Sequence, residues 1–447
     1  MRSDPTTTTH PVRAPLPAAP EPRKLGDDGD VATLLAPLLE HFFGGPPPVR
    51  FEFWDASALG PEAGDIVQVR SPDAVRRLLW APGEVGLARA FVMGDIGFEG
   101  DIFELLAALQ AGAPDRVHAG TRLPWQALQA ARRLGVIGRP LPPPPEEARP
   151  QGRLHSRRRD AQAIQHHYDV SNDFYAMVLG DAMTYSCARF APGVASLEEA
   201  QESKHDLVCR KLGLAERSGQ RVLDVGCGWG GFARHAATHY GARVVGVTLS
   251  PAQARWARDR LDAARLSDRV EIRLQDYRDV RDGPFDAIAS VGMFEHVGSA
   301  KSAEYFAALR RLLGPEGRLL NHAISSVGGS RIGPRSFIGR YVFPDGELID
   351  VGQVVLSMEE AGFEVRDVES LREHYAETLR AWVANLQRHW DAAVADVGIR
   401  RARIWLLYMA ASVIGFEDGG ISIHQVLGVV PGPGGRSGMP STRRAWD

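Results

Sequence analysis

Cysteine is scarce in this chain of 447 residues, which has only Cys187, Cys209 and Cys227. Three thiols at this spacing are too few for a disulfide framework or a repeated zinc knuckle, so we expect a reduced, cytoplasmic protein. An excess of one charge is also missing, because 52 basic and 55 acidic side chains give a net charge of -3. This balance argues against a nucleic-acid-binding protein, which needs a broad positive field.

Long hydrophobic runs are absent too. The most apolar late segment, residues 404–416, is far shorter than the roughly 20 residues of a membrane-spanning helix, so we interpret it as a core helix. Residues 1–28 are rich in Pro and Thr and lack the apolar core of a signal peptide. We therefore expect a disordered tail at the N-terminus and no segment that crosses a bilayer.

Hydrophobic residues make up 44% of the chain, which is enough to fill real cores. Apolar periodicity predicts helices over 31–44 and 71–80 and strands over 49–54 and 65–70, which together form a small mixed domain. A proline-rich stretch at 139–152 marks a linker. The predicted organisation is a tail at 1–28, an N-terminal domain at 29–113, a helical connector and linker at 114–160, a larger domain at 161–430 and a flexible tail at 431–447.

From residue 221 onward, apolar β-branched runs alternate with helical stretches of 10 to 15 residues. This alternation is typical of an α/β protein with a doubly wound, Rossmann-like parallel sheet. Ligands of such sheets bind at the carboxyl ends of the strands. The predicted segments are 221–225, 231–240, 242–249, 251–265, 270–274, 285–292, 305–314, 318–324, 363–371, 374–392, 400–415 and 421–427.

The stretch RVLDVGCGWGGFARH, residues 221–235, ends the first of these strands in a glycine-rich loop. Glycines let the backbone turn tightly and approach a nucleotide-like ligand. NAD enzymes usually place an acid about 20 residues further on, but here that position reads VVGVTLS. The loop spacing and the later LQDY (274–277) favour S-adenosylmethionine over a dinucleotide, while a turn that only packs helix on strand is the plainer alternative.

Several further blocks resemble the cyclopropane-fatty-acid synthase family, in order, over about 165–428. They are YDVSNDFY (168–175), MTYSCARF (183–190), VLDVGCGWGG (222–231), VVGVTLSPAQ (244–253), VGMFEHVG (291–298), RYVFPDGEL (340–348) and REHYAETLRAW (372–382). The stretch ARAFVMGDIGFEGD (88–101) is similar to the lipid-engaging domain of longer members. The resemblance implies a class I methyltransferase fold behind a lipid-engaging domain.

The resemblance also implies the reaction: transfer of the S-adenosylmethionine methyl group to a cis double bond in an acyl chain of a membrane phospholipid. An alkene is a weak nucleophile, so the site must hold the sulfonium against the π bond and keep water away. Aromatic faces can stabilise the cation that forms. The candidates are Tyr168, Tyr185, Trp229 and Phe294, although packing is the commoner role for any one aromatic residue.

Members of the family hold bicarbonate as the base that takes the final proton. By resemblance its binding site falls on Cys187, Glu295, His322, Ile324 and Tyr375, with His296 ranked second to Glu295. The expected cofactor-binding residues are Tyr185, Ser186, Asp224, Gly226, Gly228, Gly230, Thr248, Leu249, Gln253, Gln275 and Asp276. His166 and His167 lack the further ligands of a metal site, so we expect no catalytic metal.

Contact with the membrane is expected to be peripheral, on the inner face of the cell membrane. A basic cluster after the linker can meet anionic head groups, although it can equally be a solvated linker end. Its members are Arg153, His155, Arg157, Arg158 and Arg159.

Two stretches depart from the commonest family wording, LLNHAIS (319–325) and DGELID (345–350). They look more like the actinobacterial branch that makes a 10-methylene chain, so we favour that product over a cyclopropane. A methylene product would need a separate reductase, and the oligomeric state stays open. Two other functions remain as alternatives, a methyltransferase of a soluble small molecule and a non-catalytic lipid-binding subunit.

Overall fold

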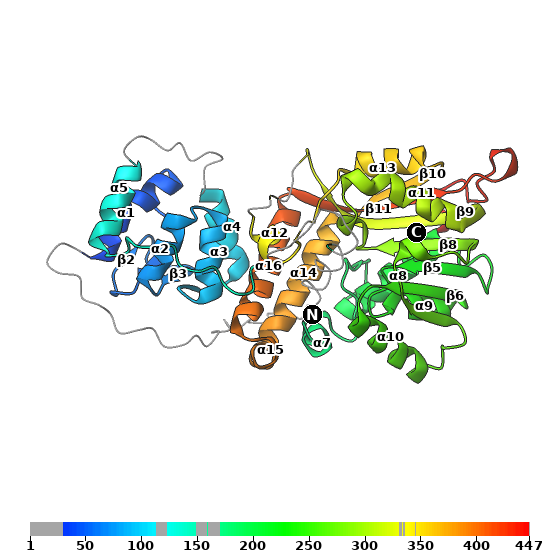
Figure 1. Ribbon diagram of the computed structural model, residues 1–447, viewed down its shortest axis with the longest axis horizontal. Coiled ribbons are helices and arrows are strands. Elements are labelled where there is room, and N and C mark those ends of the chain that lie inside the picture. Colours follow the sequence, from blue (N-terminus) through cyan, green and yellow to red (C-terminus); the bar gives the residue numbers. More distant parts are fainter. Residues whose placement is uncertain are drawn as a thin grey trace, which may run out of the picture. The chain divides into compact units, whose positions relative to one another are not determined.

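The computed structural model describes residues 30–112, 123–148, 159, 170–329, 333, 336–344 and 346–446. The chain divides into two compact units. The first comprises Met1–Glu147, Arg335–Phe337 and Gly398–Ile414, and the second comprises Ala148–Pro334, Ile338–Val397 and Gly415–Asp447. The expected N-terminal tail and most of the basic cluster lie outside the described residues. Figure 1 labels many elements of both units and colours the chain from the N-terminus to the C-terminus.

The first unit contains a four-stranded sheet in the order β2-β1-β3-β4. Its central strands β1 and β3 run parallel, and each pairs antiparallel with an outer strand. The strands predicted at 49–54 and 65–70 are confirmed to within one residue at each end, whereas the short strands β2 and β4 were not predicted. Their bounds are β1 Arg50–Phe53, β2 Ala58–Leu59, β3 Ile66–Val69 and β4 Ile96–Glu99.

Helices α1 to α5 accompany this sheet. Asp30 caps α1 by accepting a hydrogen bond from the Thr33 amide, and Ser71 caps α2, which begins at Pro72. Ala130 of α5 belongs to the same core as the strands, so the expected connector helix is part of this unit. The helices are α1 Val31–Phe43, α2 Pro72–Trp80, α3 Glu84–Met93, α4 Ile102–Gly112 and α5 Leu123–Arg133.

The second unit is built on a seven-stranded sheet in the order β10-β11-β9-β8-β5-β6-β7. Strands β5 to β9 are parallel, and β11 alone runs antiparallel to its neighbours β9 and β10. The doubly wound parallel sheet is therefore confirmed, and the antiparallel direction of β11 is the feature that was not predicted. The strands are β5 Arg221–Val225, β6 Arg243–Thr248, β7 Val270–Leu274, β8 Phe285–Val291, β9 Leu313–Ser326, β10 Glu364–Ser370 and β11 Ile421–Val429.

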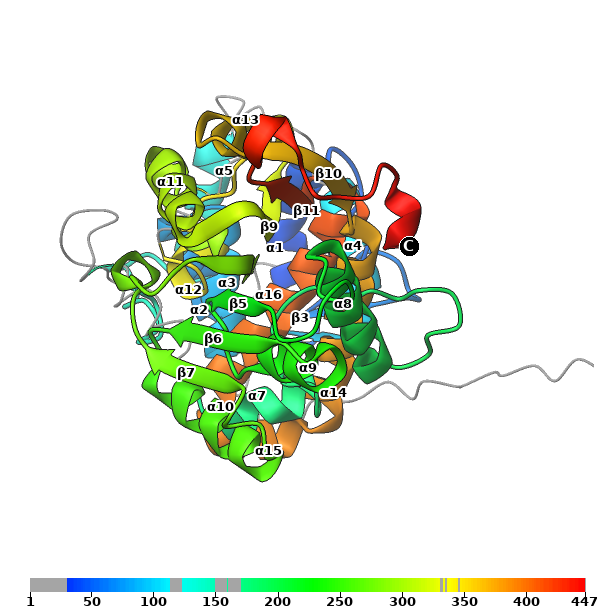
Figure 2. The same cartoon turned by 90° about the vertical axis from the view of Figure 1, so that its right-hand side faces the viewer.

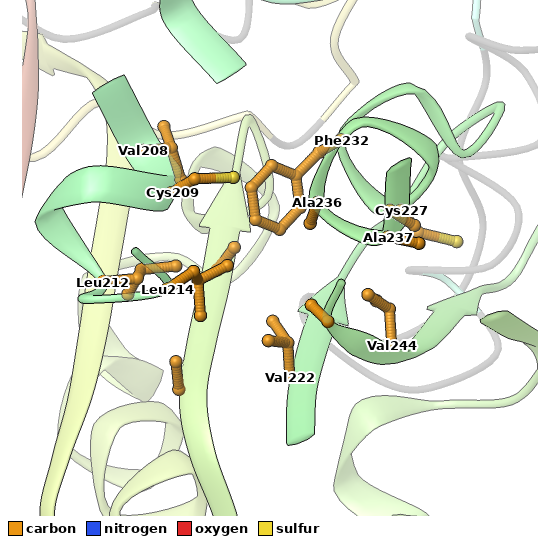
Figure 3. Close-up of a cluster of buried hydrophobic side chains, with 14 of the residues drawn as sticks. Val208, Cys209, Leu212, Leu214, Val222, Cys227, Phe232, Ala236, Ala237 and Val244 are labelled. Atoms are coloured by element: carbon orange, nitrogen blue, oxygen red, sulfur yellow. The ribbon is translucent and has the colours of Figure 1, made fainter. Parts of the chain in front are cut away.

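Helices cover both faces of this sheet because successive strand residues point to opposite sides. Val222 faces α8, α9 and α10, where Phe232 lies among the apolar side chains of α8 (Figure 3). Leu223 belongs to the core under α11 and α13. Figure 2 shows the two sets of helices on opposite sides of the strands. Their bounds are α8 Leu197–Lys211, α9 Gly231–Tyr240, α10 Pro251–Ala263, α11 Ser302–Leu312 and α13 Val351–Glu360.

The remaining helices differ from expectation in two places. The single helix expected over 374–392 is two helices, since α14 ends at Arg388 and α15 begins at Trp390. Most of α16 belongs to the first unit, where Arg400 pairs with Glu146 at 2.7 Å, so the expected domain 161–430 is interrupted. The bounds are α7 Asn172–Leu179, α12 Phe337–Tyr341, α14 Arg372–Arg388, α15 Trp390–Val397 and α16 Ile399–Glu417.

The C-terminal segment is packed rather than flexible, contrary to expectation. Trp446 is only 3% exposed and joins the core shared by α8 and α9. Arg443 forms an ion pair with buried Asp367 at 3.1 Å. The burial of Trp446 and the ion pair of Arg443 together hold a segment whose Gly and Pro content had suggested a flexible tail.

The described residues contain neither a membrane-spanning helix nor a cluster of metal ligands. None of their helices is both long and apolar enough to cross a membrane. None of their His, Cys, Asp and Glu side chains gather in threes as a metal site would require. His166 and His167 lie outside the described residues.

Candidate functional site

The glycine loop follows β5 and leads into α9. Gly226, Gly228 and Gly230 have φ values of 76°, 55° and 79°, which other residues rarely adopt. The amides of Gly226 and Cys227 both donate to the Val247 carbonyl at 3.0 Å, which ties the loop to β6. A side chain at Gly226 would lie 3.3 Å from Cβ of Met293. The loop therefore forms a tight floor at the carboxyl ends of the strands.

An open pocket lies over this floor. Its empty space, including the solvent at its mouth, is about 950 Å³. The predicted cofactor residues that line it are Gly226, Gly228, Thr248, Leu249, Gln253, Gln275 and Asp276. Sequence reasoning missed Met293 and Arg278, which also line it. The lining residues follow β5, β6, β7 and β8, as expected for a ligand at the strand ends of a doubly wound sheet.

Polar side chains of the pocket are already held in place. Thr248 Oγ1 donates to Gln253 Oε1 at 2.9 Å across the first turn of α10. Arg278 binds the Asp276 carboxylate, with Nη2 at 2.6 Å from Oδ2. These contacts fix the rotamers that an adenosine group would meet at the β6 and β7 end of the pocket.

Four predicted cofactor residues do not line the pocket. Gly230 lies where a Cβ would be 3.2 Å from Ala257, so its role is close packing of α9 on α10. Asp224 is buried in β5, two residues before Gly226. Tyr185 and Ser186 lie in the loop after α7, and the Tyr185 carbonyl is 4.0 Å from the point where a Cβ on Gly292 would stand. This loop therefore borders the pocket at Gly292.

Helix α8 holds that loop through two side chains that sequence reasoning missed. Gln201 Nε2 donates to the carbonyls of Thr184 at 3.3 Å and Ser186 at 2.9 Å. Lys204 Nζ donates to Ser186 Oγ at 3.0 Å. Both side chains are buried at 1% exposure. A Gln and a Lys three residues apart on the apolar face of a helix are the signal that would have revealed them.

Glu295 lies in a short 3-10 turn, Phe294–His296, after β8. Its Oε1 accepts a hydrogen bond from the Ile324 amide at 2.7 Å. Its Oε2 is buried and has no hydrogen-bond partner among the described residues. Burial raises the pKa of this carboxyl to about 7, against the lowering effect of the Ile324 amide. A carboxyl with one open oxygen is thus held at the edge of β9.

His322 lies in β9, two residues before Ile324, and is fully buried. Its Nδ1 is 3.2 Å from Nε2 of Gln425 in β11, while Nε2 has no partner among the described residues. Burial holds the pKa of His322 well below its usual range, so the ring is neutral. With the Gln425 amide donating to Nδ1, Nε2 carries the proton and is left as an open donor.

Cys187 and Tyr375 adjoin the same part of the sheet. The Cys187 thiol donates to the carbonyls of Ala188 at 3.1 Å and Leu371 at 3.6 Å, and burial raises its pKa. Tyr375 follows one turn after Leu371, whose amide donates to Ile423. Ile423 in turn pairs with Ile324 of β9. The five residues predicted to hold the base are therefore connected through β9, β11 and the start of α14. The Ile324 amide, however, already donates to Glu295.

Several aromatic rings pack against one another around Tyr185 and Tyr375. Tyr185 stacks on Trp382 with ring centroids 5.2 Å apart, and Tyr375 meets the same indole edge-on at 6.0 Å. Trp229 packs against Tyr175 at 4.6 Å. Trp382 was not predicted, because α14 is remote in sequence from the glycine loop.

Three other residues were named from the sequence. Phe294 is 2% exposed and packs within the α11 core, 5.1 Å from Phe306, so its role is packing. Tyr168 lies outside the described residues. His296 lines the cofactor pocket, and burial lowers its pKa to about 4, which leaves it neutral.

Comparison with known proteins agrees with this geometry. Residues 155–426 match the family described as mycolic acid cyclopropane synthetase. The chain is 44% identical over 426 residues to a probable fatty acid methyltransferase of Mycobacterium tuberculosis, covering 92% of this chain and 98% of that protein. It is 35% identical to the tuberculostearic acid methyltransferase of the same organism, covering 86% and 88%.

A solved structure is similar as well. Mycolic acid cyclopropane synthase CmaA1, complexed with SAH and CTAB, aligns with a TM-score of 0.57 and 33% identity over 60% of this chain and 98% of that one. The fold is that of a class I S-adenosylmethionine-dependent methyltransferase. The chain belongs to the mycolic acid cyclopropane synthetase family, whose members methylate lipid acyl chains.

Proposed function

We propose that this enzyme transfers a methyl group from S-adenosylmethionine to the cis double bond of an oleoyl-type chain in a membrane phospholipid, with bicarbonate as the base. The observation that carries the proposal is the pair of open polar atoms beside the cofactor pocket. Glu295 Oε2 and His322 Nε2 are both buried and lack partners among the described residues. Open buried polar atoms are costly, so they mark a place where a small polar group belongs.

The order of the polar groups along the pocket suits S-adenosylmethionine. Thr248 and Gln253 follow β6, where a ribose is expected, and Gln275 and Asp276 follow β7, where adenine is expected. The glycine floor leaves no side chain between the backbone and the ligand. The cofactor supplies an electrophilic methyl group when it is bound.

The open atoms also fit bicarbonate. The neutral His322 ring offers an N–H donor from Nε2, and Glu295 can accept the hydroxyl of the ion through Oε2. We infer that Cys187, whose thiol donates to the Leu371 carbonyl, and Tyr375, which packs on Trp382, line the same site on the α14 side. These residues hold a base next to the reacting carbons without exposing it to bulk water.

The reaction requires the protein to stabilise positive charge on the former alkene carbons. Tyr185, Trp382 and Tyr375 present a set of packed rings between the loop after α7 and α14. Aromatic faces attract cations without acting as nucleophiles or bases. We infer that these rings protect the cation until Glu295 and the ion remove its proton.

The favoured product is a 10-methylene chain. Support comes from the family departures at 319–325 and 345–350 and from 35% identity to a tuberculostearic acid methyltransferase. Proton loss after a hydride shift gives the methylene, whereas ring closure with loss of a methyl proton gives a cyclopropane. The methylene product would pass to a separate reductase for saturation.

Access to the substrate is proposed to be peripheral, from the inner face of the cell membrane. The first unit exposes Leu79 at 36%, Trp80 at 54% and Leu87 at 46% on α2 and α3. Trp side chains suit the boundary between head groups and acyl chains. The basic cluster that includes Arg157 and Arg158 would add attraction to anionic lipid.

The test is expression in a host that contains oleoyl phospholipids, followed by mass spectrometry of the fatty esters. We expect oleoyl esters heavier by one CH₂ unit, with proton NMR signals of an exocyclic methylene. Cyclopropane signals would reject the product but keep the methyl transfer. No mass gain, with cofactor present and the protein folded, would reject the proposed function.

A further inference from the structure

Lys204 of α8 is a buried lysine that the reaction outlined above does not use. It is 1% exposed, and its ammonium group donates a hydrogen bond to Ser186 Oγ at 3.0 Å. Burial lowers its pKa to about 7, which reflects the cost of keeping an ammonium group away from water. A buried lysine with a neutral hydroxyl as its hydrogen-bond partner is not a satisfied structural cation.

No described carboxylate forms a salt bridge with Lys204. Asp224 is the acid whose charge acts on the pKa of Lys204, yet Asp224 Oδ2 has no partner among the described residues, and burial raises the pKa of Asp224 to about 7. The other titratable groups that share a charge interaction with Lys204 are Cys187 in the loop, His205 on the same helix, His235 in α9 and His322 in β9. None of these is an anion, so Lys204 lacks a firm counter-charge.

The position of Lys204 points to the end of the pocket where the counter-charge belongs. The adenosine end falls on residues after β6 and β7, so the amino-acid end must extend toward β5 and β8, which lie on the far side of β6. Gly292 marks that end, and the loop carrying Ser186 borders it. Lys204 thus contacts Ser186 at the end of the pocket where we expect the methionine carboxylate.

We propose that Lys204 is a positioning residue that recognises the carboxylate of S-adenosylmethionine through the Ser186 hydroxyl. Lys204 Nζ donates to Ser186 Oγ, which leaves the Ser186 O–H free to donate to the carboxylate. The bound carboxylate then supplies the counter-charge that the protein lacks. This inference rests on S-adenosylmethionine being the cofactor, but not on the lipid substrate or its product.

The test compares S-adenosylmethionine with decarboxylated S-adenosylmethionine, which differs only by the carboxylate. Binding of each to the full-length protein and to Lys204→Met is measured by isothermal titration calorimetry. We expect Lys204→Met to weaken S-adenosylmethionine binding by about 10-fold or more, the scale of a hydrogen bond to a charged group. Binding of the decarboxylated analogue should change by less than about twofold, because it has no group for the pair to recognise.

Lys211 provides a matched control, because it is also a buried lysine of α8. It is 0% exposed but pairs with Asp367 at 2.9 Å and also with Glu369, so it has its counter-charges within the protein. Lys211→Met should lower the melting temperature without changing the ratio of the two affinities. Ser186→Ala offers a second route, because it keeps the lysine but removes the hydroxyl, and it should reduce the same ratio.

The outcomes separate this inference from the proposed function. Equal losses for both ligands in Lys204→Met would show a merely structural role and overturn the inference, as would no loss for either. If Lys204→Met does not fold, the ratio measured with Ser186→Ala decides in the same way. Failure of the unaltered protein to bind S-adenosylmethionine would instead reject the proposed function.

Discussion

At the scale of single residues, Glu295 combines an anchored oxygen with an open one. Oε1 is fixed by the Ile324 amide at 2.7 Å, so Oε2 is positioned without a partner of its own. A glutamine at this position keeps an acceptor for the amide but cannot take part in proton transfer as a carboxylate does. The role of Glu295 can therefore be tested with little change in shape.

Glu295→Gln should lower turnover at least about 10²-fold, the usual contribution of a positioned acid or base. S-adenosylmethionine affinity should stay nearly unchanged, because Glu295 is not among the pocket-lining residues. Steady-state kinetics and calorimetry measure the two effects. Glu359→Gln, an exposed carboxyl on α13, serves as the control and should behave as the unaltered enzyme. Near-normal turnover of Glu295→Gln would refute the assigned role.

The raised pKa of Glu295 also predicts a pH effect on stability. The folded-state pKa of about 7 lies above the ordinary value of 4.5, so the folded protein binds the extra proton between these pH values. Stability should therefore fall as pH rises through that window, and Glu295→Gln should escape this loss. The melting temperature of Glu295→Gln relative to that of the unaltered protein should be higher at pH 8 than at pH 5. The same difference at both pH values would contradict the prediction.

Some site residues could be predicted from the sequence and others could not. The glycine loop and Thr248 follow strands directly, so local spacing placed them at one sheet edge. Lys204 and Trp382 lie on helices, and only the tertiary packing brings them to the site. Gly230 differs in the opposite way. Its place in the glycine motif predicts a ligand contact, but in the structure it lets α9 pack closely on α10.

At the scale of elements, helix and strand positions followed from periodicity, but direction and attachment did not. Strand β5 is confirmed exactly at 221–225 because an apolar run there ends in glycine. The antiparallel course of β11 depends on how α16 returns the chain to the sheet, which a local pattern does not encode. The packed C-terminus depends on one aromatic residue that finds a pocket in the core.

Trp446→Ala tests that packing. Removing a buried tryptophan should destabilise the protein by about 3–5 kcal/mol, because the core of α8 and α9 loses its contacts. Denaturant unfolding measures this value. Trp80→Ala, at a position 54% exposed, is the matched control and should cost less than about 0.5 kcal/mol. Equal unfolding free energies of the two variants would show that the C-terminal segment does not pack on the core.

At the scale of the whole molecule, the balance of charges leaves membrane attraction to local patches. Reversing Arg157, Arg158 and Arg159 to Glu should weaken binding to anionic phospholipid vesicles in low salt, since each basic residue near a surface contributes about 1 kcal/mol. Cosedimentation at low and high salt measures the effect, which should shrink as salt rises. The same reversal at three other exposed arginines, Arg255 and Arg260 of α10 and Arg265 just after it, is the control. Equal losses in both triple variants would remove the cluster from the membrane contact.

The central claim is that the strand-end pocket brings a sulfonium methyl group against a lipid double bond. The most direct measurement incubates the purified protein with S-adenosylmethionine carrying a ¹³C-labelled methyl group and with vesicles of dioleoyl phospholipid, and follows the label by NMR. The account predicts that the label enters the acyl chain as an exocyclic methylene, and that Glu295→Gln largely abolishes its entry. Label that stays on the cofactor, or that enters a head group in place of the acyl chain, would contradict it.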